Sequence, residues 1–134
     1  MPDWSIDHIS AVTLAVHDMA ESVAFYERLG LYVSYGGPNA AFTTMRAGQS
    51  AINLRRAPQG SGNRWARVIL RVRGVDALYQ HLRAQGLHPS APKSAEWGER
   101  YVEISDPEGD VISFAEILDA SISGDTPTLL PHGT

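Results

Sequence analysis

Two stretches of the chain carry the same alternation of apolar and polar residues, each followed by the same helical pattern. Val12–Val16 has the alternation of a half-buried strand, and Val68–Val72 repeats it 56 residues later. The correspondence continues without a gap to Gly30 and Gly86, which stand where a helix C-terminus favours a left-handed residue. The pattern therefore predicts two copies of one structural unit.

The segment between strand and glycine has helical spacing in both copies. In the first copy, Asp18 is a candidate N-cap and Glu21 follows three residues later, as in a capping box. The apolar residues near helical spacing are Val23, Phe25, Tyr26 and Leu29 in the first copy and Val75, Leu78, Tyr79 and Leu82 in the second.

Strand-like segments follow each helix. In the first copy, residues 40–45 and 51–55 flank an expected turn at 46–49, and in the second copy 100–104 and 110–115 flank a turn at 105–109. A further short strand is predicted at 32–35, with a weaker counterpart near 88–90. We therefore expect an α+β fold of two tandem βαβββ modules, the first at about 6–57, the second at about 65–118, and a C-terminal tail at 119–134.

Strand side chains alternate between the two faces of a sheet. One face sorted in this way is uniformly apolar and is expected to pack under the helices. The opposite face mixes small, polar and charged residues, and it is either simply solvated or curved into a ligand cleft. Its polar members include Thr13, Asn53, Arg67, Arg71, Tyr101, Glu103 and Ser113.

Composition narrows the classes of function. The chain has 134 residues, 43% of them hydrophobic, which suits one ordinary domain with its own core. A net charge of −4 lacks the basic field of general nucleic-acid binding, and the absence of cysteine excludes disulfides and thiolate metal sites. With no signal peptide evident and no run of about 20 apolar residues, we expect a cytoplasmic protein without membrane or nucleic-acid partners.

Two segments carry a resemblance to a known family. They are the segment 12–26 with its Leu29-Gly30-Leu31 exit, and the Asp106-Pro107-Glu108-Gly109 turn before the apolar segment 111–114. Together with the repeat they resemble the vicinal oxygen chelate superfamily (glyoxalase, bleomycin resistance and extradiol dioxygenase proteins) over residues 8 to 118. The resemblance implies two βαβββ modules whose curved mixed sheets surround a cleft, often within a homodimer.

Enzymes of this superfamily usually hold one divalent metal with His and Glu side chains at four strand positions. The resemblance places those positions at Ala11, Asn53, Arg67 and Ser113. Alanine has no donor atom, arginine is a fixed cation, and the oxygens of asparagine and serine are neutral, weak ligands for a transition metal. We therefore expect no metal at these positions and no cofactor.

The five histidines do not supply an alternative metal site by spacing. No pair has the i, i+2 spacing of a strand or the i, i+4 spacing of a helix, so we interpret them as surface residues. They are His8, His17, His81, His88 and His132.

Three functions remain open. The first is a metal-independent small-molecule binding protein of the glyoxalase/bleomycin-resistance type that sequesters a drug or metabolite. The second is a glyoxalase-like lyase or isomerase, or a dioxygenase-type enzyme, with Glu103 as base and Arg67 or Asn53 stabilising an oxyanion. The third is a dimeric interaction module without a specific ligand. The candidate ligand-binding residues are Thr13, Asn53, Arg67, Arg71, Trp97, Tyr101, Glu103 and Ser113.

Several of these candidates have a purely structural alternative. Arg67 and Glu103 would neutralise each other as a cross-strand pair if the face is only solvated. Trp97 either forms an aromatic rim for a planar ligand, together with Trp65, Tyr101 and Tyr35, or covers an open end of the core.

Overall fold

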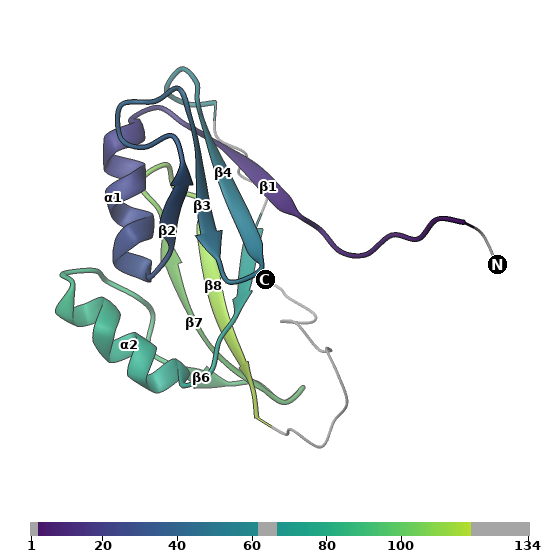
Figure 1. Ribbon diagram of the computed structural model, residues 1–134. Coiled ribbons are helices and arrows are strands. Elements are labelled where there is room, and N and C mark those ends of the chain that lie inside the picture. Colours follow the sequence, from purple (N-terminus) through teal and green to yellow (C-terminus); the bar gives the residue numbers. More distant parts are fainter. Residues whose placement is uncertain (1–2, 62–66, 119–134) are drawn as a thin grey trace. The chain divides into compact units, whose positions relative to one another are not determined.

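The computed structural model describes residues 3–61 and 67–118 (Figure 1). The chain folds into two compact units, one ending at Asn63 and the other beginning at Arg64. We call them the first and the second module. The expected tail at 119–134, Trp65 and His132 lie outside the described residues.

The first module contains one helix and one four-stranded mixed sheet. Its strand order is β1-β4-β3-β2, with β1 parallel to β4 and the other neighbours antiparallel. The elements are β1 (Ala11–Val16), α1 (Met19–Leu29), β2 (Tyr32–Tyr35), β3 (Phe42–Ala47) and β4 (Ser50–Arg56).

The expected signals at the two ends of α1 are confirmed. The Asp18 carboxylate accepts a hydrogen bond from the Glu21 backbone N–H at 3.0 Å, and Gly30 ends the helix at φ 111°. The buried face of α1 packs on the sheet. The buried apolar residues of this module are Leu14, Val16, Met19, Val23, Phe25, Tyr26, Leu29, Leu31, Met45, Ala51, Ile52 and Leu54.

The turn between β3 and β4 is shorter than the expected turn at 46–49. Ala47 pairs with Ser50, so both strands extend further than predicted and leave only two residues between them. One of the two is Gly48 at φ 59°, a conformation that a two-residue hairpin requires and glycine adopts readily.

The second module repeats the arrangement. Its sheet has the order β5-β8-β7-β6, with β5 parallel to β8 and the other neighbours antiparallel. The elements are β5 (Arg67–Arg71), α2 (Val75–Ala84), β6 (Lys93–Ser94), β7 (Glu99–Ser105) and β8 (Val111–Ile117). The two modules therefore share the βαβββ order, and the predicted α+β fold class is confirmed.

The N-terminus of α2 is capped by a side chain of strand β8. Gly74 precedes the helix and has no side chain to serve as a cap. The Glu116 carboxylate of β8 accepts the backbone N–H groups of Gly74 and Val75 at 2.9 and 3.0 Å. A carboxylate at the N-terminus of a helix also interacts favourably with the positive end of the helix dipole.

A second polar contact joins α2 to β7. The Arg100 guanidinium donates from Nε to Asp76 Oδ2 at 3.0 Å and from Nη2 to Asp76 Oδ1 at 2.9 Å. These hydrogen bonds lower the pKa of Asp76 below its ordinary value and raise the pKa of Arg100 above its own.

The prediction of a strand near 88–90 was wrong, because the short strand of this module is β6 at Lys93–Ser94. Ser90 does reach β7: its N–H donates to the Glu103 carbonyl at 2.8 Å. However, Pro89 and Pro92 have no N–H to donate, so a regular ladder forms only beyond Pro92.

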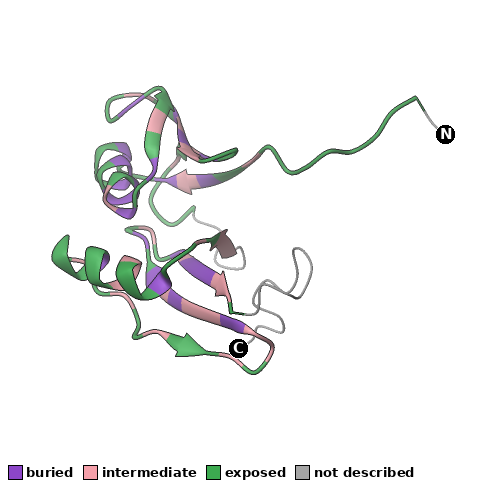
Figure 2. Ribbon diagram, turned by 60° about the horizontal axis from the view of Figure 1, so that its bottom comes forward, coloured by how far each residue is buried: buried purple, intermediate pink, exposed green. Residues whose placement is uncertain are grey.

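The exposed parts of the described chain include a long N-terminal segment. Residues 3–10 precede β1, are extended and are exposed throughout (Figure 2). Neither helix within residues 3–61 and 67–118 is long and apolar enough to cross a membrane.

Candidate functional site

The sheet of the first module has a face turned away from the buried core. The strand register aligns Thr13, Asn53 and Thr44 in one row across β1, β4 and β3. We call this surface the first outer face. Its members are Ala11, Thr13, Ala15, Tyr32, Tyr35, Phe42, Thr44, Arg46, Ala51, Asn53 and Arg55.

A hydrogen-bonded polar row crosses the middle of the first outer face. Thr44 Oγ1 donates to Asn53 Oδ1 at 2.8 Å, and Asn53 Nδ2 donates to Thr13 Oγ1 at 3.4 Å. The two bonds fix the orientation of the amide, with its oxygen toward β3 and its nitrogen toward β1. An amide nitrogen carries two hydrogens, so the second N–H of Asn53 can donate to a ligand.

A β-bulge brings two tyrosines to the first outer face. Tyr32 is paired with Arg46 and Tyr35 with Thr44, with the register shifting between Val33 and Tyr35. Residues three apart in a regular strand point to opposite faces, and the extra residue corrects for this. The bulge therefore gives β2 two exposed aromatic side chains on the same side of the sheet.

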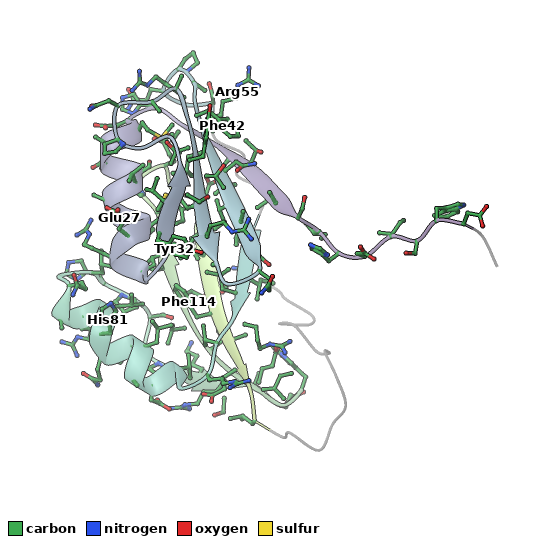
Figure 3. All side chains as sticks on the ribbon, viewed as in Figure 1. Glu27, Tyr32, Phe42, Arg55, His81 and Phe114 are labelled. Carbon is green, nitrogen blue, oxygen red and sulfur yellow. The ribbon has the colours of Figure 1, made fainter. Side chains whose placement is uncertain are left out.

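Phe42 and Arg55 lie opposite each other on β3 and β4, at one end of the first sheet (Figure 3). The Phe42 ring contacts the Tyr35 ring edge to face, with centroids 6.5 Å apart. Phe42 and Thr44 are not among the residues predicted for the site. The register of the β3–β4 hairpin places them on this face, because it pairs them with Arg55 and Asn53.

The second module has an equivalent surface with charged chemistry. We call it the second outer face. It comprises Arg67, Ile69, Arg71, Lys93, Glu99, Tyr101, Glu103, Ser105, Val111, Ser113, Ala115 and Ile117.

Three of the predicted site residues meet on the second outer face. Arg67 Nη2 lies 3.0 Å from Glu103 Oε2, and the same oxygen accepts from Ser113 Oγ at 3.3 Å. Ser113 is fully buried, while the ion-paired side chains are 29% and 32% exposed. The guanidinium, the carboxylate and the hydroxyl thus form one compact polar cluster, and its ion pair is the contact that the structural alternative for Arg67 and Glu103 predicts.

Arg71 and Tyr101 lie one row further along the same face. Both are paired with Ala115, from β5 and from β7 respectively. Arg71 is exposed and Tyr101 is half-buried. The small Ala115 between them leaves the space above it to the two longer side chains.

Trp97 differs from the other predicted site residues, since it lies in the turn before β7. Its indole Nε1–H donates to Glu99 Oε1 at 2.9 Å, and Glu99 is completely buried. The indole N–H is therefore engaged with a buried carboxylate, and both predicted roles of Trp97 remain predictions. Glu99 was missed as a candidate, although it has the same alternation as Tyr101 and Glu103.

The four positions that the resemblance assigns to metal ligands fall on the outer faces. Ala11 is opposite Ala51, Asn53 is in the polar row, and Arg67 and Ser113 belong to the charged cluster. Within residues 3–61 and 67–118, no three His, Asp or Glu side chains gather in a group that could hold a metal ion. The four histidines of these segments, His8, His17, His81 and His88, are exposed.

Solved structures provide similar folds. An antibiotic binding protein from Streptomyces sp. CB03234 is 24% identical with a TM-score of 0.72, covering 85% of this chain and 98% of that chain. A glyoxalase/bleomycin resistance protein/dioxygenase from Nocardioides is 24% identical with a TM-score of 0.70, covering 92% of each chain. A bleomycin-binding protein complexed with bleomycin is 21% identical with a TM-score of 0.67, covering 83% of this chain and 98% of that chain.

No curated protein matches the chain in sequence. A family model does: that of the Glyoxalase/Bleomycin resistance protein/Dioxygenase superfamily matches residues 5–114. This match covers most of the chain and includes both βαβββ modules nearly to the end of β8. The chain therefore belongs to the Glyoxalase/Bleomycin resistance protein/Dioxygenase superfamily.

Proposed function

We propose that this protein binds a small molecule without a metal ion and acts by sequestering it. The observation that carries the proposal is the contact of Arg67 with Glu103 and Ser113. A guanidinium occupies one of the positions at which metal-dependent relatives hold a ligand, and it pairs with the carboxylate beside it. A guanidinium fixed at this position repels a metal ion, because both are positively charged.

The other three positions support the same proposal. Ala11 offers no donor atom, and the amide of Asn53 is already engaged with Thr44 and Thr13. Ser113 offers a neutral hydroxyl that donates to Glu103. An amide and a hydroxyl are suited to hydrogen bonding and are weak ligands for a transition metal.

The similar solved structures support a proposal for the class of ligand. One is an antibiotic binding protein and another is a bleomycin-binding protein in complex with bleomycin. We extend this to the present chain as a proposal: the ligand is a drug or metabolite. The candidate binding residues are Thr13 and Asn53 on the first outer face and, on the second outer face, Arg67, Arg71, Tyr101, Glu103 and Ser113, with Trp97 in the turn before β7. We further propose that the protein acts as a homodimer, which light scattering of the purified chain tests.

The state of Glu103 argues against the enzymatic alternative. A general base works best when no fixed cation stabilises its ionised form. Glu103 Oε2 accepts from both Arg67 and Ser113, so the carboxylate is paired with a guanidinium. This pairing favours the anionic form of Glu103 and suits binding better than proton abstraction.

The test combines metal analysis with ligand screening of the full chain. We expect no stoichiometric metal after purification without a chelator, and a rise in Tm with a ligand from an antibiotic panel that includes bleomycin, unchanged by EDTA. Ligand at 100 times its Kd stabilises the folded state by about 2.7 kcal/mol. We expect Arg67→Ala to weaken this response and the exposed Arg73→Ala to leave it unchanged.

Three results would contradict the proposal. A stoichiometric metal that is lost in Glu103→Ala would favour the enzyme. A protein that responds to no ligand but is dimeric would favour the interaction module. A ligand response that is unchanged by Arg67→Ala would make Arg67 a purely structural residue.

A further inference from the structure

We propose that the first outer face binds a planar aromatic anion, with the ring of the ligand against Tyr35 and Phe42 and its acidic group on Arg55. This inference rests on the proposed small-molecule binding function and adds the chemical class of the ligand. It is carried by the aromatic pair, the arginine opposite Phe42 and the polar row that the register places on this one face.

The aromatic side chains of this face are unusually accessible. Tyr35 is 67% exposed, Tyr32 is 58% exposed and Phe42 is 36% exposed. Tyr35 and Phe42 are inclined at 62° to each other, so their faces are not stacked on one another. Exposed aromatic surface of this kind stacks with a flat apolar ligand.

The backbone around these rings is held in place. Thr43 Oγ1 accepts from the Gly37 N–H and donates to the Gly37 carbonyl, both at 3.0 Å. At Gly36, a Cβ atom would collide with the Phe42 carbonyl. The segment that follows the bulge is therefore held by a buried contact between Thr43 and Gly37 and not by the exposed tyrosines themselves.

The charge of the face favours an anion. Its ionisable side chains other than tyrosine are Arg46 and Arg55, and none of its members is Asp or Glu, although the chain as a whole has a net charge of −4. Arg46 donates to the Gln49 carbonyl at 3.1 Å. No hydrogen bond or ion pair joins the Arg55 side chain to another residue within 3–61 and 67–118, so its planar fork can take a carboxylate with two parallel bonds.

The spacing of the strands sets the size of the ligand. β4, which carries Arg55, and β2, which carries Tyr35, are separated by β3, and neighbouring strands lie about 4.8 Å apart. The distance from the guanidinium strand to the tyrosine strand is therefore roughly 10 Å, about the length of a two-ring aromatic acid. Asn53 and Thr13 would bind a further polar substituent along the sheet.

The test is an NMR titration of the ¹⁵N-labelled full chain with three matched two-ring probes. They are 2-naphthoate (anionic), 2-naphthalenemethanol (neutral) and 2-naphthylmethylamine (cationic). We expect 2-naphthoate to shift the resonances of β2, β3 and β4 and to bind at least tenfold more tightly than the other two. Phe42→Leu, which keeps an apolar side chain, should weaken all three probes.

Arg56 provides a matched control for Arg55. It is the next residue of β4, is also exposed, and points to the opposite side of the strand. Arg55→Gln should lower the affinity for 2-naphthoate about tenfold, while Arg56→Gln should change it less than twofold. Equal effects of the two variants would overturn the assignment of the anion to Arg55.

The outcomes separate this inference from the proposed function. Equal binding of the three probes, or binding only of the cationic probe or of bleomycin, overturns the anionic class and leaves small-molecule binding intact. Shifts confined to residues outside the first outer face overturn the location. If neither the probes nor the antibiotic panel bind, both the inference and the proposed function fail.

Discussion

Arg67 and Glu103 form an ion pair although their strands are not neighbours. β8 runs between β5 and β7, and the guanidinium and carboxylate meet above it at 3.0 Å. Ser113 lies beneath them on β8 and donates to the same carboxylate oxygen. The three side chains therefore link β5, β7 and β8 on the second outer face.

A double-mutant cycle measures the strength of this pair. Both side chains are partly exposed, so we expect Arg67→Ala and Glu103→Gln each to lower the free energy of unfolding by about 1 kcal/mol or less. The effects should not add, because either change breaks the same contact. Urea denaturation of the two single variants and the double variant checks this, and strict additivity would show that the pair contributes nothing.

Thr43 and Thr44 are adjacent residues on opposite faces of β3, which makes them a matched pair. Thr43 is fully buried and clamps Gly37, whereas Thr44 is half-buried and bonds Asn53. Thr43→Val leaves the N–H and the carbonyl of Gly37 without their partner, so it should lower the free energy of unfolding by about 2 kcal/mol. Thr44→Val should lower it by about 1 kcal/mol. Equal losses in thermal unfolding would show that the clamp on Gly37 is unimportant.

Glu116 is the cap of α2 and should stabilise that helix from a distance in sequence. Glu116→Ala removes both acceptors for the Gly74 and Val75 N–H groups and should cost about 1–2 kcal/mol, with Glu116→Gln losing less. The exposed Glu96→Ala provides the control. Amide hydrogen exchange at Gly74 and Val75 should accelerate in the Glu116 variants alone; unchanged exchange there would contradict the capping role.

The Asp76–Arg100 contact predicts a dependence of stability on acid pH. The hydrogen bond from Arg100 lowers the pKa of Asp76 in the folded state below its ordinary value of 3.8. The contribution is therefore complete above that value and is lost as the pH falls through the lower, folded-state pKa. Asp76→Asn should be less stable than the wild type at neutral pH, and the difference should shrink below pH 3.8. A difference that stays constant down to the acid limit would show that the carboxylate charge has no part in it.

Alanine substitutions at Gly36 and Gly48 distinguish the cost of a strained backbone conformation from the cost of a steric clash. Both have positive φ, 80° and 59°, so an alanine is strained at either position. At Gly48 the added Cβ meets open space, but at Gly36 it would collide with the Phe42 carbonyl and lie 2.9 Å from Thr43 Cα. We expect Gly48→Ala to cost about 1 kcal/mol and Gly36→Ala clearly more. Circular dichroism melts of the two variants test this; equal losses would mean that the loop relaxes freely.

Local patterns in the sequence were sufficient for the elements of the fold. The strand β1, the capped helix after Asp18 and the left-handed Gly30 are each decided by residues within a few positions of one another. The repeat at a fixed offset extended these assignments to the second module. The segments that carry the family resemblance lie in the same local patterns, and the family match confirms it.

The candidate site could be predicted only where plain alternation decides the face. Alternation grouped Arg67, Glu103 and Ser113 correctly, because β5, β7 and β8 are regular over these residues. It did not identify the common face of Tyr32 and Tyr35, because a bulge changes the count, nor the position of β6, because two prolines delay the ladder. Whether the grouped residues bind a ligand stays a prediction.

Except for the short strand β6, the sequence by itself determined which segments become strands and helices, and it determined which side chains each regular strand turns away from the core. Only the tertiary structure decided that Arg67 meets Glu103 across an intervening strand, that Glu116 caps α2, and that Arg55 lies opposite Phe42. The physical reason is that local conformation depends on neighbouring residues, whereas these contacts depend on strand order and register. Strand order and register are set by the packing of segments that are far apart in the chain.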